Sequence, residues 1–284
     1  DRSRGSELLE TIDPSLAFFQ AHPGAIYLHQ GDSYLVESMD LSTRNIYVRP
    51  VETDYYTQPM DLTDTRIIRP LRSRQYEVPL ATQPSQSADA PLQAMSSTVG
   101  AFWGQVRVTT RVIGFRRKQQ YTEAVRSLEP LDLPAQSYDT MALWFDIPPQ
   151  AASEISQRGL DLPGGLHALE HAAIGILPLF AMCDRNDIGG LSTPNHPDTG
   201  KAEIFIYDAH PGGVGISEKG YEVLPELWQA TLRLLRECPC EAGCPACVHS
   251  PKCGNNNEPL DKQAAQVILE HLLGACGASG GRGT

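Results

Sequence analysis

The chain has 284 residues, of which 41% are hydrophobic and 20% charged. This composition is typical of a globular protein with one or two domains and excludes an intrinsically disordered chain. The net charge of -11 argues against a surface that is basic throughout, since nucleic-acid binding depends on local positive charge. No apolar run approaches the roughly 18 residues that a membrane-spanning helix needs, and the first residues lack the apolar core of a signal peptide. We therefore expect a cytoplasmic protein with no membrane partner.

The first part of the chain predicts β-structure. Residues 1–13 predict a tail or a short helix. Three β-rich segments follow, and their spacing predicts an antiparallel meander over residues 25–30, 33–40 and 44–50. Gly31-Asp32 fits a tight hairpin between the first two of them.

More strands follow before residue 150. Residues 79–98 are rich in Pro, Ser, Ala and Gln and predict a flexible linker or a long loop. Strands resume over 104–118, where alternate valines share one face and arginines the other, and again over 141–147. We therefore predict a β-rich domain over 14–150.

The second half of the chain, 151–276, predicts an α/β domain. Its pattern indicates a buried helix that opens after Gly164-Gly165 and covers 166–182, an apolar strand over 202–208 and a final amphipathic helix over 260–276. Residues 277–284 predict a disordered tail. The predicted fold class is α+β, with a β-rich N-terminal half followed by an α/β C-terminal half that carries a zinc knuckle.

The zinc knuckle is predicted from a cluster of cysteines in segment 238–253. Five of the chain's 7 cysteines lie there: Cys238, Cys240, Cys244, Cys247 and Cys253. Glycine and prolines between them allow turns that bring the thiolates to one tetrahedral ion, and zinc is the usual occupant of four-sulfur sites. We expect Cys240, Cys244 and Cys247 to be ligands, with Cys238 and Cys253 competing for the fourth place.

Other chemistries of a cysteine cluster are open alternatives. A disulfide framework needs an oxidising compartment and favours an even number of cysteines in a short chain. The number here is odd, and most of the cysteines are confined to one end of the chain. A redox or iron–sulfur site is the remaining alternative.

A basic strip with aromatic neighbours predicts binding of single-stranded nucleic acid. Cationic side chains can follow a phosphate backbone while aromatic rings stack on bases. The candidate residues are Arg107, Arg111, Phe115, Arg116, Arg117 and Lys118. The alternative is a solvated β-hairpin whose arginines only face water.

A second motif suggests hydrolytic chemistry. His167, Glu170 and His171 match H-x-x-E-H, in which two histidines on one helix face can bind a metal while the glutamate activates water. Asp208 and His210, at the end of a predicted strand, extend this candidate site. The alternative function is thus a metal-dependent nuclease or peptidase, although the sequence identifies no third metal ligand.

The chain lacks motifs for ATP hydrolysis. It contains no Walker A sequence and no D-E-x-D/H box. We therefore assign no catalytic residue, and an ATPase motor, if one is involved, must lie outside these residues.

Several segments together resemble a known family over most of residues 24–270. They are GAIYLHQGDSYLVESMDL, WGQVRVTTRVIGFRR, LHALEHAAIGILPLFAMCDRNDIGGLS, IFIYDAHPGGVGISEKGYE and CPCEAGCPACVHSPKCGNNNEPLDKQAA. The chain resembles the C-terminal region of bacterial superfamily 2 DEAD/DEAH-box helicases typified by mitomycin repair factor A. The resemblance implies a DNA repair helicase with 3′-to-5′ translocation on single-stranded DNA, driven by ATP in RecA-like domains upstream in the same polypeptide. It also implies that the cysteine cluster is a zinc-binding segment.

Overall fold

The computed structural model of the chain describes residues 7–78 and 97–279. Most of the predicted loop over 79–98 and parts of both predicted tails lie outside the described residues. The chain forms two compact units, each described below by itself. The first unit contains Asp1–Thr63 and Thr109–Ser137, and the second contains Asp64–Val108 and Tyr138–Thr284. Whether 14–150 and 151–276 fold as separate domains stays a prediction.

The first unit contains the predicted antiparallel meander. Helix α1 (Pro14–Gln20) begins after Asp13, whose side chain accepts a hydrogen bond from the backbone N–H of Ser15. The meander has the order β1-β2-β3, formed by β1 (Ile26–His29), β2 (Asp32–Asp40) and β3 (Asn45–Pro50). The turn residues are Gln30 and Gly31, both with positive φ, rather than the predicted Gly31-Asp32. Two positive φ values match a hairpin turn that follows the twist of the strands.

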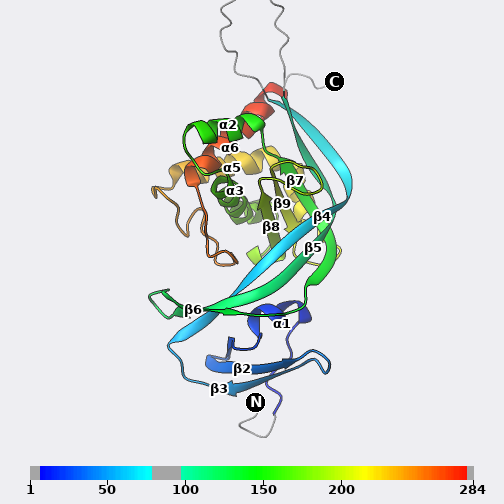
Figure 1. The fold of residues 1–284 in the computed structure, drawn as a ribbon. Coiled ribbons are helices and arrows are strands. Elements are labelled where there is room, and N and C mark those ends of the chain that lie inside the picture. Colours follow the sequence, from blue (N-terminus) through cyan, green and yellow to red (C-terminus); the bar gives the residue numbers. More distant parts are fainter. Residues whose placement is uncertain (1–6, 79–96, 280–284) are drawn as a thin grey trace, which may run out of the picture. The chain divides into compact units, whose positions relative to one another are not determined.

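Two long strands, β4 (Tyr55–Val78) and β5 (Ser97–Gln119), contribute residues to both units and are visible in Figure 1. In the first unit, β6 (Val125–Pro130) pairs antiparallel with the end of β5. The register shifts at Arg117/Lys118. Such a bulge turns side chains away from strict alternation.

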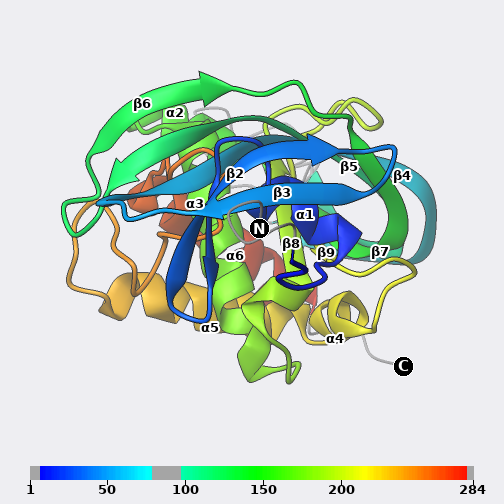
Figure 2. The ribbon, with the colours of Figure 1, turned by 90° about the horizontal axis from the view of Figure 1, so that it is seen from below.

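The second unit combines a sheet with a group of helices. Strands β7 (Gln136–Asp146), β9 (Glu203–Asp208) and β8 (Ile188–Thr193) continue the sheet in the order β4-β5-β7-β9-β8. The longer helices are α2 (Pro149–Gln157), α3 (Leu162–Ile176), α5 (Leu224–Glu237) and α6 (Lys262–Ser279). The shorter ones are η2 (Leu177–Leu179), η3 (Arg185–Asp187) and α4 (Ile216–Glu222). Helix α3 contacts α5, α6, β8 and β9, and Figures 1 and 2 show the longer helices gathered beside β8 and β9.

Helix α3 is the centre of the core of the second unit. It begins at Leu162, four residues before the predicted start, because Asp161 caps it by accepting a hydrogen bond from the backbone N–H of Gly164. A Cβ added at Gly165 would lie 2.5 Å from the Cβ of Ala264 on α6. The two helix backbones therefore approach so closely that only glycine fits at this position.

The predicted α+β fold class is confirmed, because strands dominate the first half and helices gather in the second. The segment after the glycine turn forms two helices, α4 and α5, that meet at Val223. Within the residues that the structure describes, no helix combines the length and apolar character needed to cross a membrane.

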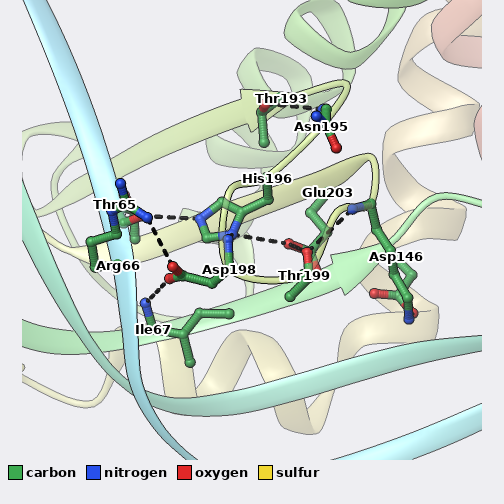
Figure 3. A network of polar contacts seen from close by, with 11 residues as sticks. Thr65, Arg66, Ile67, Asp146, Thr193, Asn195, His196, Asp198, Thr199 and Glu203 are labelled. Carbon is green, nitrogen blue, oxygen red and sulfur yellow. Dashed lines mark hydrogen bonds and ion pairs between the residues drawn. The ribbon is translucent and has the colours of Figure 1, made fainter.

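A buried polar network holds the loop between β8 and β9 (Figure 3). His196, fully buried, places Nε2 2.9 Å from the carbonyl oxygen of Thr65 on β4. Its Nδ1 lies 3.6 Å from Oε2 of Glu203, which is also fully buried. The hydroxyl of Thr199 donates to the same carboxylate oxygen at 2.9 Å. The network thus ties the loop to two strands of the sheet.

Asp198 makes a second connection from the same loop to β4. Its carboxylate accepts hydrogen bonds from the backbone N–H of Ile67 and from Nη1 of Arg66, both at 2.9 Å. Both hydrogen bonds to Asp198 persist when the pH changes near neutrality. Glu203, in contrast, has a shifted pKa. Burial, followed by the effects of the nearby Asp146 carboxyl, raises the pKa of Glu203 to about 7.

The raised pKa predicts a specific dependence of stability on pH. A carboxyl whose pKa is higher in the folded than in the unfolded state stabilises the fold below its unfolded pKa of 4.5. That contribution is lost as the pH rises through about 7. We expect the free energy of unfolding to fall by roughly 1–3 kcal/mol from this group over that interval. Denaturant unfolding of wild type and Glu203→Gln at several pH values measures it, and an identical pH dependence in both proteins would contradict the assignment.

Candidate metal centre

Four of the five clustered cysteines converge between α5 and α6. The ligand atoms of Cys238, Cys240, Cys244 and Cys247 all lie within 4.8 Å of one another. The Sγ atom of Cys238 lies 3.5 Å from the Sγ of Cys240 and 3.5 Å from that of Cys244. Cys247 Sγ lies 3.4 Å from that of Cys240 and 3.8 Å from that of Cys244. Four sulfurs bound tetrahedrally to zinc at about 2.3 Å are about 3.8 Å apart, so the thiols fit this ion.

Local turns and burial place these thiols. The backbone N–H groups of Cys247 and Val248 both donate to the carbonyl of Cys244, at 3.0 and 3.2 Å. This turn brings the sulfurs of the C-x-x-C pair to the same side. Val248 is fully buried and Cys247 is 4% exposed in the core beside α3, α5 and α6. The cluster is therefore anchored to the helices at its C-terminal end.

Lys262, the first residue of α6, supplies a positive charge to the cluster. Its Nζ donates to the carbonyls of Cys238 and Cys240 at 2.8 and 2.6 Å and lies 3.4 Å from Cys240 Sγ. The residue is only 5% exposed. A buried ammonium next to thiolates lowers the cost of their negative charge. No sequence motif singles out this lysine, because its role depends on how α6 packs against the cluster.

The thiols of the cluster differ in their affinity for protons. Burial acts to raise the pKa of Cys240, but hydrogen bonds, first with Cys247 and Cys238 and then with Lys262, lower it to about 6. Burial, together with the hydrogen bond to Cys240, raises the pKa of Cys247 to about 12. Of these two thiols, Cys240 is the one that more readily becomes a thiolate.

Cys253, the other predicted candidate for the fourth place, lies in a different group. Its Sγ is 3.4 Å from Nε2 of His167, and the ligand atoms of these residues and His171 lie within 4.8 Å of one another. The structure therefore brings Cys238, not Cys253, to the other three thiols. The two cysteines outside the cluster are free thiols.

The H-x-x-E-H motif is divided by the structure. The rings of His167 and His171 lie with centroids 4.3 Å apart. Glu170 is 8% exposed and lies against Gly190 of β8. Burial raises the pKa of Glu170, and a hydrogen bond with Ser192 partly offsets this increase. Glu170 is thus directed to the sheet and does not join the converging ligand atoms.

Asp208 and His210 have other partners. The carboxylate of Asp208 accepts backbone hydrogen bonds from Val214, Gly215 and Ser217 at 2.6, 2.8 and 2.7 Å. It thereby holds the glycine turn that precedes α4. His210 Nε2 lies 2.9 Å from a carboxylate oxygen of Asp187. Among the described residues, neither Asp208 nor His210 joins a group of converging metal ligands.

Two of the predicted DNA-binding arginines form exposed ion pairs. Arg107 makes two contacts with Asp139, at 2.7 and 3.1 Å. Arg111 contacts Asp132 at 2.5 Å and the carbonyl of Leu133 at 3.1 Å. Both guanidinium groups remain about half exposed.

The remaining predicted DNA-binding residues lie at the end of β5. Phe115 is 3% exposed and packs against the ring of His22, so its side chain lies in the interior of the first unit. Arg117 lies over the ring of Tyr55, with 5.6 Å from Cζ to the ring centroid. Lys118 is 9% exposed and lies 3.5 Å from Glu123, while Arg116 is partly exposed.

An exposed aromatic residue follows this strand and was not among the predicted site residues. Tyr121 is 98% exposed at the tip of the β5–β6 hairpin. Its φ of 67° is uncommon for a residue other than glycine or asparagine. Its sequence neighbours Gln120 and Thr122 gave no sign that the chain turns here.

Comparisons with known proteins agree with this geometry. A family model described as MZB, MrfA Zn-binding domain, matches residues 169–248. The ATP-dependent helicase HRQ1 of Saccharomyces cerevisiae is 28% identical over 94% of this chain and 24% of its own length. The uncharacterized ATP-dependent helicase YprA of Bacillus subtilis is 28% identical over 85% of this chain and 29% of its own length. The uncharacterized protein MJ1572.1 of Methanocaldococcus jannaschii is 45% identical over 38% of this chain and 99% of its own length.

The fold is also similar to that of a solved structure. The crystal structure of the DUF1998 helicase MrfA bound to DNA matches 92% of this chain and 31% of its own, with a TM-score of 0.53 and 26% sequence identity. The fold and the converging thiols define a zinc-binding α+β protein. The chain matches the C-terminal region of MrfA-like helicases, and its cofactor is zinc. It spans about a quarter of the length of the yeast and Bacillus helicases.

The convergence of thiols predicts that metal removal destabilises the second unit. We expect Cys244→Ser or Cys247→Ser to lose zinc and several kcal/mol of stability, because metal binding supplies roughly 10 kcal/mol or more of folding free energy in small zinc modules. Thermal melts followed by circular dichroism, with and without a chelator, measure the loss. Cys183→Ser is the matched control, and a Cys244→Ser protein with the wild-type melting profile would count against the prediction.

The position of Lys262 predicts an effect on zinc affinity. Lys262→Met keeps a side chain of similar length but removes the charge and both hydrogen bonds to the cysteine carbonyls. We expect zinc to bind about 10- to 100-fold more weakly, the usual cost of losing a group that supports metal ligands. Competition with a coloured chelator measures the affinity. Lys219→Met, at an exposed site on α4, is the control, and equal affinities in all three proteins would contradict the role of Lys262.

Proposed function

We propose that the chain is an accessory region of a cytoplasmic, ATP-dependent 3′-to-5′ DNA helicase that acts in DNA repair. In this proposal Cys238, Cys240, Cys244 and Cys247 hold one structural zinc ion, and the region engages single-stranded DNA beside RecA-like domains of the same polypeptide. The main support is the convergence of these four thiols at the end of the segment that matches the MrfA Zn-binding domain. The similarity in fold to a helicase bound to DNA is further support.

The composition of the cysteine cluster favours a structural role. Four thiolates complete the tetrahedral coordination of zinc and leave no position for water or substrate, whereas catalytic zinc sites keep one position open. The ion then joins the end of α5 to the start of α6, because the segment with the ligands connects Glu237 to Lys262. The cluster thus holds structure together and does no chemistry.

The β5–β6 hairpin is the best-supported surface for single-stranded DNA. Arg116 and Arg117 lie on β5 just before the turn, and the exposed ring of Tyr121 stands at its tip. Guanidinium groups can contact phosphates while an exposed ring stacks on a base. In this proposal Tyr121 takes the stacking role that the sequence suggested for Phe115.

Contacts with β4 and the residue before it hold the hairpin in place. Arg126 on β6 makes two hydrogen bonds with the carboxylate of Asp54, at 2.8 and 2.5 Å. Glu123 contacts the hydroxyl of Tyr56 and the ammonium of Lys118. These bonds anchor both sides of the turn, so that Tyr121 is presented on a rigid support, which reduces the entropy lost on binding.

Removal of the arginines tests the electrostatic part of the proposal. We expect Arg116→Ala/Arg117→Ala to weaken the binding of a single-stranded oligonucleotide and to reduce the salt dependence. The slope of log affinity against log salt should fall by about 1.4, since each phosphate contact contributes about 0.7. Fluorescence anisotropy at several salt concentrations measures both quantities. Arg158→Ala/Arg236→Ala, at the C-cap of α2 and on α5, is the control. Unchanged affinity in the Arg116/Arg117 variant would refute the assignment.

Removal of the exposed ring tests the stacking part. We expect Tyr121→Ala to lose about 1–3 kcal/mol of binding free energy, which is typical of one stacked base, with the salt slope unchanged. Tyr121→Phe should retain the affinity, because its ring can still stack. An oligonucleotide that binds the alanine and phenylalanine variants equally well would show that the ring is not used.

A further inference from the structure

A second set of metal-binding side chains lies outside the four-cysteine cluster. His167 and His171 are four residues apart on α3 and therefore share one face of the helix. Cys253 approaches this face from the segment that connects the cysteine cluster to α6. The ligand atoms of all three residues lie within 4.8 Å of one another.

Backbone carbonyls determine which ring nitrogen of each histidine carries the proton. Nδ1 of His167 lies 2.8 Å from the carbonyl oxygen of Pro259, and Nδ1 of His171 lies 2.8 Å from that of Val248. A carbonyl oxygen only accepts hydrogen bonds, so each Nδ1 must carry the proton. Nε2 of each ring is then left with the lone pair that binds a metal. Metal-bound histidines commonly have this support from a carbonyl.

Cys253 is positioned as a sulfur ligand. The residue is 7% exposed, and its Sγ accepts a hydrogen bond from the backbone N–H of Asn257 at 3.3 Å. The distance of 3.4 Å from its Sγ to Nε2 of His167 is close to the value of about 3.5 Å expected when sulfur and nitrogen bind one tetrahedral zinc ion.

The segment that carries Cys253 is ordered by its own hydrogen bonds. The backbone N–H of Ser250 donates to Oδ1 of Asn257 at 2.7 Å, and Nδ2 of Asn257 donates back to the carbonyl of Ser250 at 3.1 Å. The same segment supplies the carbonyls of Val248 and Pro259 that orient the two histidines. One short segment thus provides a ligand and fixes the other two, and a metal ion here would attach it to α3.

From this geometry we propose that His167, His171 and Cys253 bind a second transition-metal ion, most suitably zinc. Two imidazoles and one thiolate are a donor set of zinc sites. Among the described residues, no fourth Cys, His, Asp or Glu ligand joins the group, so water completes the coordination. A cavity of about 300 Å³ borders His171 and is lined in part by Ser250 and Lys252, which gives solvent a route to the site.

The site differs from a hydrolytic centre in one respect. Glu170, which the H-x-x-E-H motif would use to activate water, is buried against β8. Glu170 is therefore not placed to act as a base for water bound to the second metal ion. We infer that this metal fastens the segment between Val248 and Pro259 to helix α3.

Metal analysis of the 284-residue chain tests the proposal. We expect about two zinc ions per chain after dialysis against metal-free buffer, measured by mass spectrometry of the metal. Cys253→Ser and His171→Ala should each reduce the content to about one, whereas Cys183→Ser and His210→Ala, outside both groups, should leave it at about two. A wild-type content of about one, or a Cys253→Ser protein that retains about two, would overturn the proposal.

Two further measurements separate loss of a ligand from loss of the fold. Cys253→His supplies another metal ligand and should retain about two ions, while circular dichroism checks that each variant keeps its helices. After replacement of zinc by cobalt, the visible absorption of Cys253→Ser should lose the part due to two-histidine coordination and keep that of the four-thiolate site. An unchanged cobalt spectrum in Cys253→Ser would also contradict the proposal. These results do not depend on DNA affinity, so they stand or fall separately from the proposed function.

Discussion

The convergence of four thiols between α5 and α6 is the constraint on which the arrangement of the second unit depends. Residues 238–261 contain no helix or strand, and few of them are buried in the core. Fixing their backbone costs conformational entropy, which this small amount of apolar burial does not offset. Binding of zinc contributes folding free energy to small modules and so compensates part of this cost. It also sets where α6 begins, because Lys262 contacts the ligand carbonyls. Helix α6 then covers α3 at the glycine contact, so that the metal and the helical core stabilise each other.

Much of the fold followed from simple sequence patterns, and its exceptions have physical causes. β-Rich runs with turn residues between them predicted the meander, and a continuous apolar run predicted β9, whose six residues are all buried. The pattern of apolar residues in the second half predicted helices α3 and α6. The same reasoning was wrong for the hairpin turn, where Gln30 adopts positive φ beside Gly31. It also missed the partners of Cys253. Cys253 and His167 are far apart in the sequence. They come into contact only because the connecting segment packs on α3.

The end of β5 shows why the candidate DNA surface was only partly predictable. Strict alternation places Phe115 on the same face as the exposed Arg107 and Arg111, yet Phe115 is buried. In the first unit β5 buries residues of both parities, Val112 as well as Phe115, because His22 and Gly24 cover the phenylalanine ring. A strand that belongs to two compact units thus meets two cores, and a single pattern cannot describe both. Tyr121 is exposed because the chain reverses there, a property of the turn that alternation does not encode.

Helix α3 connects the two metal-binding groups to the sheet and clarifies the H-x-x-E-H motif. On a helix, Glu170 lies about 100° around the axis from His171, so the glutamate and the histidine can face different neighbours. In this protein Glu170 meets β8, where Ser192 is its partner, and the two histidines meet the segment that carries Cys253. The motif therefore divides into a buried acid that packs against the sheet and a pair of imidazoles oriented by carbonyls. A hydrolase needs all three groups around one water molecule. The structure separates them, which favours metal ions that hold the region together over metal ions that perform catalysis.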